Sequence, residues 1–282
     1  MNDFAARFGP WAVVTGASSG IGEAFARQLA AKGIHLVLVA RRHDRLRNLA
    51  DEIQGRYAVN TRIVPVDLAA DNFLSVVADA TQDLDIGLLV NNAGVARTGG
   101  FLDHPLEDEL NQLNLNTRAM MVLAHHFGRR LRDRQRGGIV FVASTLAFAG
   151  VPGMSGYAAT KAYALTFAEG FAREVAGNGI DVLALCPGPT RTEIWPSGAK
   201  LSLSMRPEDV VEIALQKLGR RTIVVAGLAN RLITISTRFT PRWMNSLIFG
   251  KVVGGMLKNV PMPSSPQAVV NRDTAVIGTV QD

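Results

Sequence analysis

I-V-F-V-A-S-T-L-A-F-A-G-V-P-G-M-S-G-Y-A-A-T-K, residues 139–161, is the stretch that decides the fold of this chain. Its first five residues are an uninterrupted apolar run, which is typical of a strand buried on both faces of a sheet. The run ends at Ser144, so a hydroxyl is expected at the rim of that sheet. A loop with glycines and a proline follows, and a helix is predicted from about Ser155. The stretch therefore predicts a strand, a loop and a helix, with polar side chains where the strand ends.

Tyr157 and Lys161 lie four residues apart on the expected helix, so the phenol and the ammonium project from one face. With Ser144 they would form a proton-transfer group. A nearby cation favours the phenolate, and lowering the pKa of Tyr157 by ~3 units would need roughly 4 kcal/mol from Lys161 and a cofactor cation. For this pair alone the alternative stays open, namely a half-buried tyrosine and an exposed lysine at a helix start.

The composition is that of a globular protein with an ample core, with 282 residues of which 48% are apolar. The single cysteine, Cys186, excludes an internal disulfide framework and is expected to be a buried structural residue. The N-terminus lacks the apolar segment of a signal peptide, and no window reaches 18 uninterrupted apolar residues. A cytoplasmic protein is therefore expected. The five histidines lack metal-ligand spacing, so no metal is expected.

The net charge of +6 is unevenly distributed along the chain. Between Ile213 and Arg272 there are nine lysines or arginines and no acidic residue. The rest of the chain is mildly acidic. This pattern argues against a nucleic-acid-binding protein and for a basic C-terminal arm on an acidic body.

A glycine-rich turn, T-G-A-S-S-G-I-G at residues 15–22, follows a short apolar run and precedes a helical pattern. Strand, glycine turn and helix is the context in which backbone N–H groups bind the pyrophosphate of a dinucleotide. No G-K-[ST] follows, so a nucleotide-hydrolysing loop is not supported. A plain tight turn is the alternative. The candidate cofactor-binding residues are Gly16, Ser18, Ser19, Gly20, Ile21 and Gly22.

Arg41 indicates which dinucleotide is used. It follows the second expected strand, residues 34–40, where proteins that bind NAD tend to carry an acid for the ribose 2′-OH. This chain has Ala40 there, and a guanidinium suits a 2′-phosphate. NADP(H) is therefore expected. A solvated arginine pair at a helix start is the alternative.

Further apolar runs alternate with helical segments along the chain. Strands are expected at residues 11–15, 34–40, 61–66, 86–90, 139–143, 180–186 and 222–226, and helices at 71–83, 105–134, 155–176 and 208–218. This alternation predicts an α/β fold with a doubly wound, Rossmann-like sheet of seven parallel strands and ligands at their carboxyl ends. Asn116 falls in the middle of a predicted helix, where it either faces solvent or kinks the helix and aims a carbonyl at a site.

The chain resembles the short-chain dehydrogenase/reductase family. The resemblance rests on TGASSGIG (15–22), NNAG (91–94), Asn116, Ser144, YAATK (157–161) and PGPTRT (187–192), in the family's order and spacing. It covers residues 10–192. Two departures are Ala143 before the serine, where many members have a second serine, and the region beyond about 228, which matches no general family feature.

The resemblance implies a role for each matching residue. Tyr157 would be the general acid/base, and Lys161 would hold the nicotinamide ribose and depress the pKa of the tyrosine. Ser144 would bind the substrate oxygen, and Asn116 would position a water in a proton relay. The implied cofactor contacts are Asp67 and Leu68 with the adenine, Asn91, Ala93 and Gly94 along the cofactor, and Pro187, Gly188, Thr190 and Thr192 at the nicotinamide.

Three segments are expected: a catalytic domain at 1–227, an amphipathic basic helical arm at 228–260, and a loose tail at 261–282. The arm follows the last strand and is interpreted as a lid over an apolar substrate pocket, as a contact to an anionic membrane surface, or as a subunit contact. A second amphipathic pattern in it ends before Gly254. A loop at 201–205 is expected to close over the substrate, which would be a lipophilic carbonyl or secondary alcohol.

The predicted assembly is a homodimer or homotetramer. Helices 105–134 and 155–176 carry apolar or small residues around more than one face, including Leu106, Leu110, Leu113, Leu123 and Phe127 on the first, whereas a helix covering a sheet needs one stripe. Family resemblance points to the same interface. Two other functions are weighed: an epimerase or dehydratase that retains its nicotinamide, and a cofactor-sensing binding protein without turnover.

Overall fold

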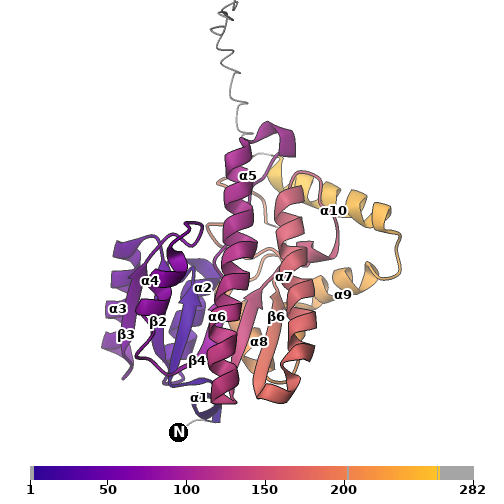
Figure 1. The fold of residues 1–282 in the computed structure, drawn as a ribbon. Helices are drawn as coiled ribbons and strands as arrows, with labels where there is room; N and C mark the ends of the chain where they lie inside the picture. Colours follow the sequence, from indigo (N-terminus) through magenta and orange to yellow (C-terminus); the bar gives the residue numbers. More distant parts are fainter. Residues whose placement is uncertain (1–2, 202, 259, 261–282) are drawn as a thin grey trace, which may run out of the picture.

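Seven parallel strands form one sheet in the order β3-β2-β1-β4-β5-β6-β7 (Figure 1). The computed structural model describes residues 3–201, 203–258 and 260, so the expected tail lies outside the described part. The strands are β1 Trp11–Thr15, β2 His35–Ala40, β3 Thr61–Pro65, β4 Ile86–Asn91, β5 Gly137–Val142, β6 Ile180–Cys186 and β7 Ile223–Val225. The seven-stranded, Rossmann-like fold predicted from the sequence is confirmed.

Helices cover both faces of the sheet. Side chains of α2, α3 and α8 pack on one face, whereas those of α4, α6 and α7 pack on the other. The helices are α1 Asp3–Phe8, α2 Gly20–Ala30, α3 His43–Arg56, α4 Phe73–Asp79, α5 Leu106–Leu113, α6 Ala119–Arg134, α7 Ser155–Glu174, α8 Pro207–Lys217, α9 Leu228–Ser236 and α10 Arg242–Leu257. Alternate strand residues point to opposite faces of the sheet. Val14 packs in the core with α2, α3 and α8, and Val13 packs in the core with α4, α6 and α7.

The strand order reverses between β1 and β4, because β2 and β3 lie on one side of β1 and all later strands on the other. Crossover connections leave the sheet in opposite directions at this point. In doubly wound sheets such a switch point opens a crevice at the carboxyl ends of the strands. The glycine-rich turn after β1 and the N-N-A-G segment after β4 both end there.

The helix predicted over 105–134 is not continuous. It divides into α5, a π-helical segment at Asn114–Arg118, and α6. Asn116 lies in the π-helical segment and is buried, so the solvent-facing alternative is wrong. Its side chain bonds to the backbone of Val95, as described below, and a polar side chain engaged in this way explains the local break.

Several element boundaries differ from those expected. The helix α4 is shorter than the predicted 71–83, and β5 starts at Gly137 rather than at 139. The N-terminal helix α1 carried no sequence signal. The helix α10 continues through Gly254 and Gly255 to Leu257, although the glycines were expected to end the pattern. Packing of one face of α10 on the body outweighs the low helix propensity of glycine.

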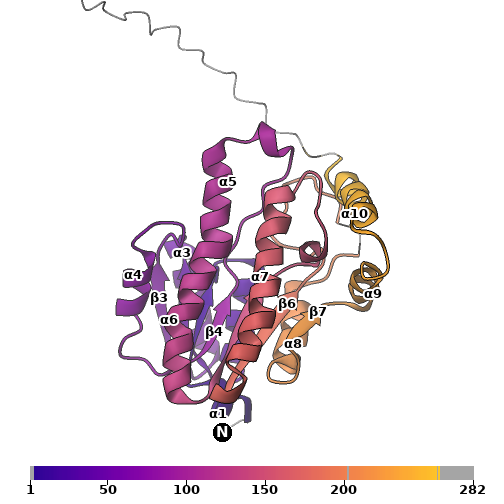
Figure 2. The ribbon, with the colours of Figure 1, turned by 45° about the vertical axis from the view of Figure 1, so that its right-hand side comes forward.

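The C-terminal arm consists of α9 and α10, a helical hairpin beside the upper end of α7 (Figure 2). The buried side chain of Asn245 fixes its turn by donating to the carbonyls of Thr237 (3.0 Å) and Thr240 (3.2 Å). A Cβ added to Gly250 would lie 3.1 Å from the Pro152 ring, so α10 packs closely on the turn that precedes α7. Among the described residues no helix is long and apolar enough to cross a membrane.

Candidate active site

A cavity of about 700 Å³ extends along the carboxyl ends of the strands. At one end it is lined by Arg41, Asp67 and Leu68, and at the other by residues of α10, and Tyr157 lines it as well. Most of the predicted site residues meet in this cavity. They are Gly16, Ser18, Ser19, Gly20, Ile21, Arg41, Asp67, Leu68, Ala93, Gly94, Ser144, Tyr157, Lys161, Pro187, Gly188, Thr190 and Thr192.

The glycine-rich turn has the conformation that a phosphate-binding loop needs. Gly16 and Gly20 have φ values of 65° and 59°, a region that other L-residues rarely adopt. A Cβ on Gly20 would lie 2.8 Å from Thr192, and one on Gly16 would lie 2.8 Å from the amide of Asn92. The turn and the first residues of α2 line the cavity. A pyrophosphate fits such a site, because a helix N-terminus that follows a glycine turn offers backbone N–H donors.

Gly22 has a different task from the other glycines of the turn. It does not line the cavity, and its added Cβ would lie only 2.3 Å from the carbonyl oxygen of Gly16. It lets α2 pack closely on the turn that follows β1.

Asn91 and Asn92 point to opposite sides of the sheet, as consecutive strand residues do. Asn91 is buried away from the cavity, where its amide donates to the carbonyl of Met120 on α6 (3.1 Å). Asn92 lines the cavity and donates to the carbonyl of Thr15 (2.8 Å). The sequence motif N-N-A-G contained this residue, but the sequence interpretation chose its neighbour.

The Thr15 side chain joins the glycine turn to the end of β4. Its hydroxyl accepts from the N–H groups of Asn92 (2.9 Å) and Ala93 (3.0 Å) and donates to the carbonyl of Val90 (3.1 Å). These bonds hold the glycine turn and the N-N-A-G segment in register. The sequence motif at residues 15–22 begins with Thr15, but it predicted no role for this hydroxyl.

At the adenosine end, the two adjacent arginines diverge. Arg41 lies 3.8 Å from the carboxylate of Asp67 and remains largely exposed. Arg42 turns towards the glycine turn and donates to the hydroxyls of Ser18 (3.0 Å) and Ser19 (2.8 Å). Both arginines line the cavity, so the pair, rather than Arg41 alone, faces the region expected for a 2′-phosphate.

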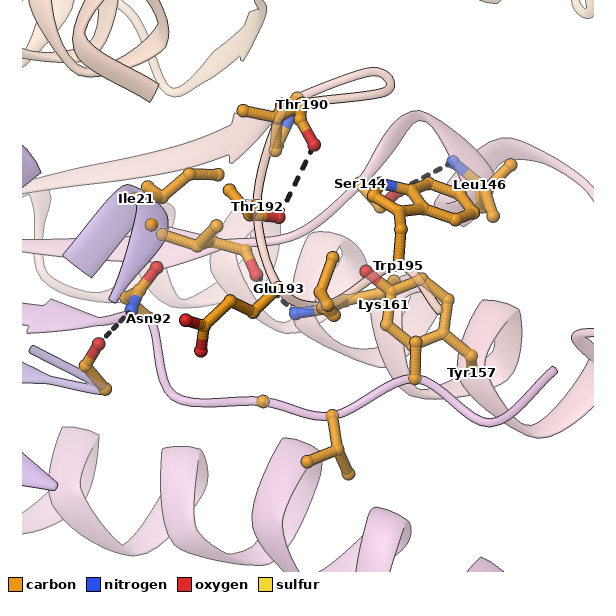
Figure 3. A pocket seen from close by; sticks show the side chains of 18 of the residues that line it. Ile21, Asn92, Ser144, Leu146, Tyr157, Lys161, Thr190, Thr192, Glu193 and Trp195 are labelled. Atoms are coloured by element: carbon orange, nitrogen blue, oxygen red, sulfur yellow. Dashed lines mark hydrogen bonds between the residues drawn. The ribbon is translucent and has the colours of Figure 1, made fainter. Parts of the chain in front are cut away.

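Ser144, Tyr157 and Lys161 come together at the end of β5 and the first turns of α7 (Figure 3). Ser144 caps a short 3₁₀ turn, its Oγ accepting from the N–H of Leu146 (3.1 Å). The Nζ of Lys161 donates to the carbonyl of Val142 (2.8 Å) and lies 5.6 Å from the centre of the Tyr157 ring. All three side chains are buried. A hydroxyl, a phenol and an ammonium gathered in one cavity can together move a proton to or from a substrate oxygen.

Burial dominates the pKa values of these groups. It raises the pKa of Tyr157 to about 12, against the lowering effect of its hydrogen bond with Ser144. It lowers the pKa of Lys161 to about 8. In the chain without cofactor the pKa of Tyr157 therefore lies above its usual value, and the expected depression, which includes a cofactor cation, stays a prediction. The Nζ of Lys161 is held at a backbone carbonyl instead of at the phenol oxygen.

Asn116 supports the site from behind and does not line the cavity. Its Oδ1 accepts from the N–H of Val95 (2.9 Å), while its Nδ2 donates to the carbonyl of Val95 (2.9 Å) and to the hydroxyl of Thr160 (3.0 Å). It thereby joins the π-helical segment to α7, one residue before Lys161. A Cβ on Gly94 would lie 3.1 Å from Oδ1 of Asn116 and 3.5 Å from Nζ of Lys161.

The loop after β6 crosses the cavity. Thr190 pairs with Met205 in an isolated parallel bridge, and the hydroxyl of Thr192 bonds to the carbonyl of Thr190 (3.4 Å; Figure 3). The loop then carries Glu193 and Trp195 into the cavity lining, and Leu203 lines it as well. The position of Leu203 agrees with the expected proximity of residues 201–205 to the substrate region.

The substrate end of the cavity is mostly apolar. Trp195 packs against the cluster that contains Tyr157, Phe249 and Val253, so the arm contributes directly to the pocket wall. Of the wall residues, only Ile248 and Val252 belonged to the amphipathic pattern predicted for the arm. The others are Val95, Ala96, Leu146, Ile194, Trp195, Ile233, Phe249, Val253 and Met256. Apolar side chains without spacing constraints carry no motif, so only the amphipathic pattern of the arm pointed to them.

The chain belongs to the short-chain dehydrogenase/reductase family, because the family model described as short chain dehydrogenase matches residues 10–200. As a member with this fold, it is an oxidoreductase of the hydride-transfer type. No group of three or more possible metal ligands occurs among the described residues.

Individual relatives agree with this assignment. A 7beta-hydroxysteroid dehydrogenase of Clostridium sardiniense is 33% identical over 236 residues, covering 81% of this chain and 90% of that protein. A structure from work on 7beta-hydroxysteroid dehydrogenase stereoselectivity has a TM-score of 0.83 at 29% identity and covers 88% of this chain and 99% of that chain. A short-chain dehydrogenase from Sphingobium yanoikuyae in complex with NADPH has a TM-score of 0.74 at 36% identity, covering 82% and 93%.

Proposed function

We propose that this protein is an NADP(H)-dependent oxidoreductase that interconverts a carbonyl and a secondary alcohol on a lipophilic substrate. One observation carries the proposal. Ser144, Tyr157 and Lys161 meet inside one cavity that has a dinucleotide cradle at one end and an apolar wall at the other. Polar chemistry is thus confined to one edge of an otherwise apolar pocket, as in sites that bind apolar molecules in a fixed orientation.

The proposed chemistry is general acid catalysis by Tyr157. The bound nicotinamide supplies the hydride for the carbonyl carbon. Tyr157, with a pKa of about 12, is protonated at neutral pH and can donate its proton to the carbonyl oxygen as charge develops there. Ser144 donates a second hydrogen bond to that oxygen. No covalent bond to the protein is required.

Lys161 and Asn116 support this proton transfer. The Lys161 ammonium, buried beside the tyrosine ring, supplies a positive field that stabilises the phenolate formed after transfer. It would also hold the nicotinamide ribose. Asn116 is tied to Val95 and Thr160, and we propose that it maintains the path by which Tyr157 is reprotonated.

The choice of NADP(H) is supported by charge at the adenosine end. Arg41 and Arg42 line the cavity, and Ala40 stands where an acid would repel a 2′-phosphate. The Sphingobium yanoikuyae relative is known in complex with NADPH.

The lipophilic substrate is supported by the pocket wall and by the relatives. Phe249 and Val253 of α10 are buried against the cluster that contains Tyr157. The Clostridium sardiniense relative is named for a steroid substrate, which is large and apolar. We propose that α9 and α10 form a lid over substrates of this size class.

A steady-state assay tests the proposal against its alternatives. NADPH oxidation should occur with bulky apolar ketones and should disappear in Tyr157→Phe. A cofactor-sensing protein would bind NADPH without turnover of any carbonyl. An epimerase or dehydratase would convert its substrate without net NADPH consumption, and this result would overturn the proposal.

We also propose a homo-oligomer. The helices α5 and α6 follow one another end to end, with α7 beside them (Figure 2), and Leu106, Leu110 and Leu113 of α5 are exposed. Leu123 and Phe127 of α6 are buried against the sheet instead, so they are not part of this surface. Contiguous exposed apolar side chains of this kind mark subunit contacts. Light scattering should give the mass of a dimer or tetramer; a monomer mass would contradict it.

The outer face of the arm supports a contact to an anionic membrane surface. Phe239 and Trp243, at the turn between α9 and α10, are 84% and 64% exposed, and the surrounding segment contains no acid. The full chain should co-sediment with anionic liposomes at low salt and not with neutral ones. Equal partition to both would remove this contact from the proposal.

A further inference from the structure

Glu193 places a carboxylate in the cofactor cavity next to the residues that face the glycine turn. It follows Thr192 in the loop between β6 and α8, and its side chain points into the cavity (Figure 3). The carboxylate accepts from Nη1 of Arg42 (2.8 Å) and from Nη1 of Arg45 (2.7 and 2.9 Å). Hydrogen bonds from Arg42 and then Arg45 hold the pKa of Glu193 below its usual value.

Arg42 binds Glu193 and the glycine turn at the same time. While Nη1 binds Glu193, Nη2 donates to the hydroxyls of Ser18 and Ser19, at 3.0 and 2.8 Å. Two guanidinium groups thus hold the carboxylate, and one of them also donates to the hydroxyls of the glycine turn. Guanidinium groups are also donors that bind a phosphate.

Glu193 connects this position to the substrate side. It lies two residues before Trp195, which packs against the cluster containing Tyr157. The ion pairs with Arg42 and Arg45 therefore fasten the loop after β6 to the end of β2 and the start of α3, across the cavity. Within the described residues these are the ion pairs that Glu193 forms.

We infer that Glu193 is an internal competitor of the cofactor 2′-phosphate, which must displace the carboxylate from Arg42 and thereby loosens the attachment of the loop after β6, leaving Arg45 as its ion-pair partner. The inference rests on the proposed use of NADP(H). A 2′-phosphate carries close to two negative charges at neutral pH, so it repels a carboxylate held by the same guanidinium. A 2′-hydroxyl carries no charge and leaves the ion pairs in place. Glu193 thus affects affinity for the phosphorylated dinucleotide and affects the unphosphorylated one little.

Binding of cofactor fragments to the full chain tests this inference. The probes are adenosine 2′,5′-bisphosphate and 5′-AMP, measured by calorimetry. Glu193→Gln keeps the shape and removes the charge, and it should bind the bisphosphate about tenfold more tightly than wild type with unchanged 5′-AMP affinity. Glu208→Gln, an exposed acid at the start of α8, controls for the change in net charge and should behave as wild type.

Three results of this binding experiment would overturn the inference. If wild type prefers the bisphosphate and Glu193→Gln gains nothing, the inference fails while the proposed cofactor stands. Weaker bisphosphate binding by Glu193→Gln would show that Glu193 helps to retain the phosphate, which also overturns it. If neither protein prefers the bisphosphate over 5′-AMP, the choice of NADP(H) falls and the inference falls with it.

The mobility of the loop after β6 can be measured separately. Hydrogen exchange of residues 193–201 should become faster in wild type when the bisphosphate binds and should stay unchanged with 5′-AMP. In Glu193→Gln it should already be fast without any ligand. Equal exchange rates in wild type with both probes would contradict a loosening of the loop after β6.

Discussion

The two ends of the cavity are built in different ways. The cofactor end is made by backbone turns that follow β1, β4 and β6, and the turn after β1 has Gly16 and Gly20 in conformations that other residues resist. The substrate end is made by apolar side chains from α10 and the loop after β6, which pack without a fixed spacing. The first depends on main-chain geometry, so few sequences satisfy it. The second depends on volume, and many sequences satisfy it.

Substitutions at the two ends of the cavity should therefore have different effects on activity. At the cofactor end, changing one polar group should lower the turnover rate, or the preference for NADPH over NADH, equally for every substrate. At the substrate end, changing one side chain should alter which substrates are used. The following predictions test this division, starting with the largest effect.

Tyr157→Phe should reduce turnover about a thousandfold for small and bulky ketones alike, because the proton donor is lost in both cases. NADPH affinity should stay nearly unchanged. The matched control is Tyr163→Phe on the same helix, since its hydroxyl contacts Met121 (3.2 Å) outside the cavity. Steady-state kinetics of both variants decide the matter. A loss restricted to bulky ketones would break the division between the two ends.

Lys161→Met should change how stability depends on pH. The folded chain binds the lysine proton with a pKa of about 8, against 10.5 for the free side chain, so between these values the unfolded state binds more protons. The stability of wild type relative to the variant should therefore rise by about 3 kcal/mol as pH increases from 8 to 10.5. Below pH 8 the cost of burying the charged lysine is fully present.

Urea unfolding without cofactor at a series of pH values measures this effect. The buried thiol of Cys186, whose pKa burial raises to about 12, interacts electrostatically with Lys161, so both proteins are compared in a Cys186→Ala background. Lys251→Met, which removes an exposed lysine of α10, is the control. Parallel stability curves for wild type and Lys161→Met would contradict the buried charge.

Phe249→Ala should lower kcat/KM for bulky apolar ketones by a few tens of fold, since truncation removes a pocket wall. Small ketones should be affected much less, and NADPH affinity should persist. Phe239→Ala makes the same substitution at an 84% exposed position of the same arm and should leave kinetics unchanged. If small and bulky ketones lose activity equally, α10 is not a substrate wall.

Arg41→Ala should remove most of a preference for NADPH over NADH that we expect to be at least tenfold, or ~1.4 kcal/mol. Arg42→Ala should have a comparable effect, since both side chains line the cavity. Arg47→Ala, exposed on α3 outside the cavity, is the control. Dissociation constants from fluorescence titration provide the comparison. Equal constants for the two dinucleotides in wild type would contradict the assignment.

The sequence predicted the cofactor end well, for a physical reason. Gly16 and Gly20 are required by positive φ, and Tyr157 and Lys161 are placed by the helical repeat, so local constraints appear directly in the sequence. What it missed depends on tertiary packing. Asn92 rather than Asn91 faces the cavity because of the orientation of β4, and the pairing of Arg42 with Glu193 joins residues 151 positions apart. The break at Asn116 likewise requires Val95 as partner.

The close contact between Gly250 and Pro152 has a consequence for engineering. Part of the apolar pocket wall comes from the last two described helices, and α10 packs on the body at this glycine. A segment spanning α9 and α10 can therefore be exchanged as one cassette between relatives, changing substrate scope while the proton-transfer machinery stays intact. Grafts that keep glycine at position 250 should seat correctly. Those that place a larger residue there should push the cassette away from the turn leading into α7.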